Sequence, residues 1–142
     1  MSSDPSNHVC TTVGVKELGF LHGSISWNER YQRYVMIGEV RGEFYISFTR
    51  DFIHWTQRVA VPGLREICES YVPFTTGFCT YPSLLPDSLE DEQEVLNSIN
   101  NNKRNLNWIE EDSAWVYYIR FMDGESTTRN IYRVKVSFEA DF

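Results

Sequence analysis

One pattern of aromatic and apolar segments occurs twice in this chain, and it constrains the fold more than any other feature. In each copy a short segment is followed by a long apolar segment and then by a third segment. The copies comprise residues 23–28, 33–38 and 43–51, and residues 80–86, 115–120 and 130–136. In the first copy Phe44, Ile46 and Phe48 alternate with polar side chains, which is typical of a half-buried strand. Each copy therefore predicts three consecutive antiparallel strands.

Two such sets of strands predict an all-β fold. Consecutive antiparallel strands form the blades of β-propellers. We therefore expect two antiparallel propeller-like blades, at about residues 20–62 and 80–138, within a single β domain over residues 11–142. Residues 1–10 are polar and are expected to form a flexible N-terminus. The alternative is a small β-barrel or β-sandwich that is unrelated to propellers.

One short helix is expected as an insertion near residues 88–100, between the first two strands of the second blade. Ser88 followed by Asp91 forms an acidic variant of the capping box. Apolar residues then recur at helical spacing up to Ile99. Two blades leave open strand edges, and open edges favour pairing with another chain. We therefore expect either self-association or further blades that complete the fold.

Charge and hydropathy narrow the classes of partner. The 142 residues include 13 basic and 20 acidic residues, for a net charge of −7, which argues against a nucleic-acid partner. No apolar run reaches the roughly 18 residues that a membrane-spanning helix needs. The first residues lack the apolar core of a secretory signal, so a cytoplasmic location is slightly favoured. No cofactor motif is present, and none is expected.

The three cysteines leave two alternatives open. They are Cys10, Cys68 and Cys79, and none forms a CxxC motif. Cys68 and Cys79 can bridge a loop in an oxidising compartment. Free thiols are the favoured prediction, because a scaffold built on disulfides carries more cysteines.

Residues 49–55 contain the most specific local motif. Thr49, Asp51 and Trp55 have the spacing of a turn between two strands, in which the carboxylate accepts backbone N–H groups and the indole packs beneath. The functional alternative makes Asp51 a catalytic carboxylate. The structural interpretation is favoured, because this turn lies at the outer corner of the predicted blade.

Candidate binding residues lie on the first strand of each predicted blade, because that strand lines the central channel of a propeller. They are His22 and Ser24 in the first blade and Tyr81 and Ser83 in the second. Gly23 permits close approach of a ligand to the backbone beside His22. The competing interpretation is a half-exposed histidine that a neighbour satisfies.

No catalytic or metal-binding residue is identified. The acidic run at residues 110–112 is expected to form a solvated loop, because adjacent side chains of an extended segment point to opposite sides. The histidines have no ligand spacing, so no metal site is predicted. The aromatic residues of the second blade are expected to pack in the core and within the blade, and any exposed rings offer platforms for sugars.

These segments resemble the blades of five-bladed β-propeller glycoside hydrolases. The resemblance is carried by residues 23–28, 33–36, 45–47 and 51–55, and by a closing blade at 81–85, 115–120 and 129–138. It covers about residues 20–138 and corresponds to the C-terminal blades of such an enzyme. His22 is similar to a channel histidine found near the substrate in some related propellers.

The resemblance implies carbohydrate chemistry around a central pocket, with a pair of carboxylates that act on the glycosidic bond. Enzymes of this family are longer and draw their acids from several blades, and no residue of this chain matches a catalytic acid or base. We therefore expect the chain to bind carbohydrate rather than to catalyse. The alternative is a non-catalytic protein-interaction or oligomeric module.

Overall fold

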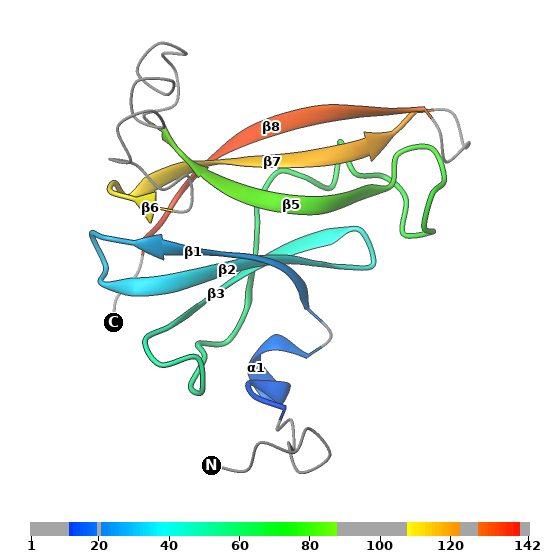
Figure 1. Cartoon of the computed structure of the whole chain (residues 1–142). Helices are drawn as coiled ribbons and strands as arrows, with labels where there is room; N and C mark the ends of the chain where they lie inside the picture. Colours follow the sequence, from blue (N-terminus) through cyan, green and yellow to red (C-terminus); the bar gives the residue numbers. More distant parts are fainter. Residues whose placement is uncertain (1–11, 20, 88–107, 123–127, 140–142) are drawn as a thin grey trace, which may run out of the picture.

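The computed structural model describes residues 12–19, 21–87, 108–122 and 128–139. Two sheets lie one above the other, and a short helix lies below the first sheet (Figure 1). The predicted helix near residues 88–100 and the predicted flexible N-terminus at 1–10 fall outside the described residues. The all-β prediction is confirmed, because strands dominate the described residues and the one helix is a single turn.

The first sheet contains five strands in the order β4-β3-β2-β1-β6, and the second contains three in the order β5-β7-β8. The first sheet consists of β1 (His22–Asn28), β2 (Arg33–Val40), β3 (Glu43–Thr49), β4 (Val59–Ala60) and β6 (Trp108–Ile109). The second consists of β5 (Cys79–Pro86), β7 (Ser113–Phe121) and β8 (Arg129–Ser137), and the helix α1 comprises Val15–Leu18. All neighbouring strands are antiparallel except β1 and β6, which are parallel.

The tightest hairpin joins β2 to β3 at the predicted turn. Arg41 and Gly42 both have positive φ, 54° and 78°, as in the two-residue turns that match the twist of a hairpin. Gly42 also lacks room for a side chain, because a Cβ there would lie 2.8 Å from the carbonyl oxygen of Ser70. The Arg-Gly pair therefore sets the register of β2 against β3.

The core lies between the two sheets. Val35, Ile37 and Phe44 face it from the first sheet, and Leu84, Val116 and Tyr118 face it from the second. Each of these side chains is at most 2% exposed. Alternate residues of β2 and β7 thus point into one shared core, as the period of two in a strand requires.

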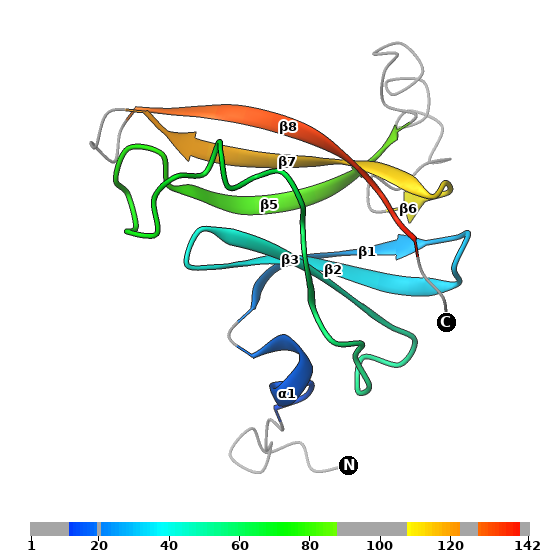
Figure 2. The same cartoon turned by 180° about the vertical axis from the view of Figure 1, so that it is seen from behind.

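A disulfide between Cys68 and Cys79 corrects the favoured prediction of free thiols for this pair. The segment at residues 61–78 crosses from the first sheet to the second, which Figure 2 shows from behind. This segment brings Cys68 next to Cys79 at the start of β5, and the Cα atoms of the two cysteines lie 5.4 Å apart. The spacing of the cysteines alone did not reveal that they lie close together, because the apolar residues of the segment 63–78 follow no regular period.

The first strands of the two sheets lie side by side and run in the same direction. The hydroxyl groups of Ser24 and Ser26 on β1 donate hydrogen bonds to the carbonyl oxygens of Pro82 and Leu84 on β5. From the first bond to the second, the bonded residue advances by two positions along β1 and by two along β5, so the two strands run in the same direction. The described strands form no closed sheet. In the described part of the chain, no helix is long and apolar enough to cross a membrane.

The disulfide gives a first prediction. The double variant Cys68→Ala/Cys79→Ala should lower the free energy of unfolding by about 3 kcal/mol, because the bridge restricts a short loop of the unfolded chain. Urea denaturation followed by tryptophan fluorescence measures the change. A reducing agent should destabilise the wild-type protein by a similar amount and leave the double variant unchanged. Equal stability of the two proteins under oxidising conditions would contradict the predicted role of the bridge.

Candidate functional site

The four candidate binding residues all lie on the two adjacent strands β1 and β5. The side chain of His22 is 68% exposed at the start of β1, and Tyr81 on β5 is 58% exposed. The hydroxyl group of Ser24 instead joins the sheets through its bond to Pro82. Ser83 pairs with Tyr117 on the face of the second sheet that points away from the core. Of the four, His22 and Tyr81 are therefore best placed to meet a ligand.

A buried carboxylate, Glu39, lies beneath this end of the two strands. Glu39 is 4% exposed, although it belongs to the central strand β2. Its Oε1 accepts the backbone N–H of Gly42, and its Oε2 accepts the hydroxyl of Thr80 at 3.2 Å. The Nε2 of His22 lies 3.3 Å from the same Oε2. The carboxylate thus has the hydrogen bonds that a buried charge requires.

Sequence analysis did not identify Glu39, although the sequence contains a signal for it. The side chains of Val35 and Ile37 point into the core, and Glu39 is the next residue with the same parity. A carboxylate at an inward position of a central strand is uncommon, because carboxylates are seldom buried without partners. The alternation along β2 therefore singles out this residue, and only the fold supplies its partners.

Tyr81 is directed outward by an irregularity of β5. The pairing of β5 with β7 shifts register between Thr80 and Ser83, and Tyr81 has a φ of 55°. Positive φ is rare for a bulky residue, and strained positions concentrate at functional sites. Bulges also redirect side chains. Tyr81 directly follows Thr80, the residue whose hydroxyl contacts Glu39.

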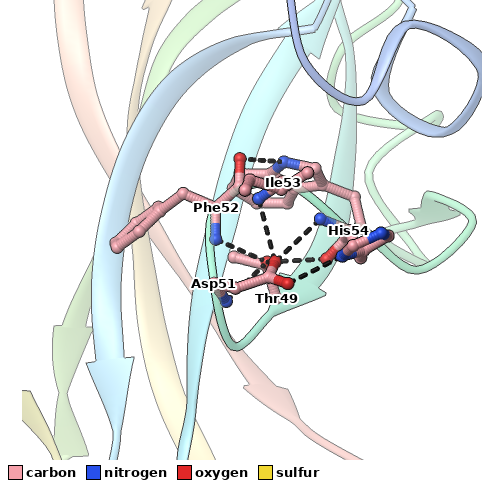
Figure 3. A network of polar contacts seen from close by, with 6 residues as sticks. Thr49, Asp51, Phe52, Ile53 and His54 are labelled. Carbon is pink, nitrogen blue, oxygen red and sulfur yellow. Dashed lines mark hydrogen bonds and ion pairs between the residues drawn. The ribbon is translucent and has the colours of Figure 1, made fainter.

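The turn around Asp51 has the structure that its motif predicts (Figure 3). Asp51 Oδ1 accepts the backbone N–H groups of Ile53 and His54 at 2.9 and 2.8 Å. The Oδ2 lies 2.7 Å from Nδ1 of the His54 ring. The hydroxyl of Thr49 accepts the N–H of Phe52 and donates to the carbonyl of His54. Because these bonds all lie within the turn, Asp51 acts as a structural residue.

The same contacts displace the pKa values of both partners. The bond to the His54 ring, followed by the two backbone N–H groups, holds the pKa of Asp51 well below its ordinary value of 3.8. The bond to Asp51 raises the pKa of His54 above its ordinary value of 6.5. Asp51 and His54 are therefore both charged between pH 3.8 and pH 6.5. The charged pair also extends below pH 3.8 and above pH 6.5, because the two pKa values are shifted apart.

A row of aromatic rings crosses the outer face of the first sheet. Ring centroids lie 6.1 Å apart for Trp108 and Trp27, 4.9 Å for Trp27 and Tyr34, and 4.2 Å for Tyr34 and Phe52. Trp108 and Phe52 are 43% and 41% exposed. The row thus combines ring-to-ring packing with an accessible surface.

The aromatic residues of the second sheet divide between two environments. Tyr118 and Phe138 are buried in the core, as expected. Trp115 lies on the outer face instead, with the guanidinium of Arg133 4.1 Å from its ring centroid. All three residues therefore pack either in the core or against side chains of their own sheet.

The acidic residues at 110–112 are exposed, as expected for a solvated loop. Asp112 pairs loosely with Arg30 at 3.8 Å. Among the residues that the structure describes, no group of three or more potential ligands is arranged to hold a metal ion.

Comparison with known proteins gives no relative from which to assign an activity. No family model matches the chain, and no curated protein or solved structure matches it. The function is therefore inferred from the residues of this chain.

The turn at Asp51 yields a second prediction. In an NMR titration, the imidazole of His54 should titrate above 6.5, and Asp51→Asn should return it toward that value. The raised pKa of His54 contributes stability that is complete below 6.5 and is lost as pH rises through the folded value. The lowered pKa of Asp51 contributes stability that is present above pH 3.8 and is lost as pH falls through the folded value.

Asp112→Asn, which removes an exposed carboxylate outside the turn, serves as the control. An unchanged His54 titration in Asp51→Asn would refute this account.

Proposed function

We propose that this chain is a carbohydrate-binding part of a β-propeller, and that it binds its ligand around His22 and Tyr81 where β1 and β5 meet. Two successive sets of antiparallel strands support the proposal. Their first strands, β1 and β5, lie side by side and run in the same direction. First strands of neighbouring propeller blades are arranged in this way around a channel.

One observation carries the choice of site. A buried carboxylate, Glu39, contacts the exposed ring of His22 and the hydroxyl of Thr80, and the exposed Tyr81 follows at once on β5. The position of His22 is thereby restrained from below, while its side chain remains 68% exposed. Restrained polar groups and accessible aromatic rings are both features of small-molecule sites.

The chemistry of these groups suits a sugar. A sugar ring has an apolar face of C–H groups, and the flat ring of Tyr81 offers a surface on which that face can stack. The sugar hydroxyls can exchange hydrogen bonds with the imidazole of His22 and the phenol of Tyr81. No charge on the ligand is needed, so we expect neutral oligosaccharides to bind.

Binding without catalysis fits the state of Glu39. Both of its oxygens already accept hydrogen bonds from the protein, and it is 4% exposed. A glycosidase needs two carboxylates that flank the scissile bond. Glu39 instead positions His22 and the turn at Gly42, so we propose a positioning role for it.

Tyr81→Gly tests the proposal. Glycine adopts positive φ readily, so this variant removes the ring without straining the bulge. A panel of neutral oligosaccharides is titrated by calorimetry into the wild-type protein and the variant. The affinity for the best ligand should fall about tenfold, which corresponds to about 1.4 kcal/mol.

Tyr71→Ala is the matched control, because Tyr71 is 50% exposed and lies outside the site. It should bind the ligand as tightly as the wild type. The proposal fails if no oligosaccharide binds, or if Tyr81→Gly and Tyr71→Ala bind equally well.

A second candidate, an oligomeric or protein-interaction module, is favoured by the open edge of the second sheet. No described strand pairs with the outer edge of β8, where Ile131 is 75% exposed. A long edge with an exposed apolar residue tends to pair with another chain.

The second candidate predicts that the mass measured by light scattering increases with concentration, and that Ile131→Lys suppresses the increase. A lysine on an edge strand opposes pairing through its charge. Thr128→Lys, which adds the same charge beside the strand, should have a smaller effect. A constant monomeric mass would exclude self-association through this edge.

A further inference from the structure

A hollow lies beside β3 and the turn of the β2–β3 hairpin. It has a volume of about 520 Å³ and is lined by Arg41, Glu43, Tyr45, Arg58, Arg65 and Tyr71. It adjoins a hollow of about 370 Å³ with which it shares Glu43, Tyr45 and Arg65. None of these residues belongs to the proposed carbohydrate site.

Positive charge is concentrated in this hollow, although the chain as a whole is acidic. Three arginines reach it from separate segments: Arg41 from the hairpin turn, Arg58 from the approach to β4, and Arg65 from the loop that follows. The lining contains one carboxylate, Glu43. The net charge of the lining is thus +2, against −7 for the chain.

Groups within the hollow already balance the charge of Glu43. Arg65 donates to its Oε1 from Nε and Nη2, at 3.1 and 3.0 Å, and the hydroxyl of Tyr45 donates to its Oε2 at 2.6 Å. The hydrogen bond from Tyr45 is the largest of the effects that lower the pKa of Glu43. The carboxylate and Arg65 therefore form a matched pair, and the excess positive charge comes from Arg41 and Arg58.

These two arginines differ in how firmly they are held. Arg58 lies over the ring of Tyr45, 4.7 Å from its centroid, and donates to the carbonyl oxygen of Leu18 at 2.8 Å. This stacking holds its guanidinium at the hollow. Arg41 is exposed at the turn and forms no ion pair with any described residue. One guanidinium is therefore preorganised, and the other is available.

We propose that this hollow binds the oxyanion of a small acidic ligand, with Arg41 and Arg58 as its donors and Tyr45 and Tyr71 as walls for the rest of the molecule. Guanidinium groups match the planar carboxylate and the tetrahedral sulfate or phosphate through paired N–H donors. The inference is independent of the neutral carbohydrate site at His22 and Tyr81.

The test is an NMR titration of the whole chain that follows backbone and arginine Nε resonances. The probes are inorganic phosphate, sulfate and glucuronate, with glucose as the neutral control and sodium chloride holding the ionic strength constant. Saturable shifts should appear at the hairpin turn and around Arg58, with a dissociation constant of about 1 mM or tighter for the best anion. Tighter binding of phosphate or sulfate identifies a phosphorylated, sulfated or inorganic ligand, and tighter binding of glucuronate identifies a sugar acid.

Arg41→Gly removes one donor without disturbing the turn, because glycine suits the φ of 54° there. It should weaken binding of the anion about tenfold, and Arg41→Gly/Arg58→Met should abolish saturation. Arg50→Gly, which removes an exposed arginine outside the hollow, is the matched control and should leave the affinity unchanged. The proposal is overturned if no anion gives saturable shifts, if glucose binds as well as the anions, or if Arg41→Gly and Arg50→Gly behave alike.

Discussion

The hydrogen bonds of one buried carboxylate connect most of the features described above. Glu39 holds the β2–β3 turn through Gly42, holds β5 through Thr80, and contacts His22 at the start of β1. A buried carboxyl group needs hydrogen-bond partners, and these contacts supply them. Glu39 therefore links the two sheets, the exposed histidine and the hairpin that carries Arg41.

Small residues beside Glu39 allow the first sheet to pack as it does. A Cβ at Gly23 would lie 1.9 Å from the carbonyl oxygen of Ile37, and one at Gly38 would meet the backbone of His22 at 2.7 Å. Along the meeting line of the sheets, Ser24 and Ser26 donate their hydroxyls to the backbone of β5. Short polar side chains thus replace a backbone ladder between the two sheets.

The two proposed sites differ in charge although one hairpin separates them. The site at His22 and Tyr81 exposes an aromatic ring and an imidazole above a buried carboxylate. The hollow beyond the turn presents Arg41 and Arg58 with a single, paired carboxylate. We propose neutral polar ligands for the first and anions for the second, because guanidinium groups form charge-assisted hydrogen bonds with oxyanions.

Local sequence determined the longer strands, the Arg41-Gly42 turn and the hydrogen bonds of Asp51, because each depends on residues close together in the chain. It also placed His22 and Ser24 on the first strand of one strand set, and Tyr81 and Ser83 on the first strand of the other. Only the tertiary structure decided the partners of Glu39, the Cys68–Cys79 bridge and the convergence of the three arginines. The positions of these residues depend on how the two sheets and the segment between them pack rather than on any local period.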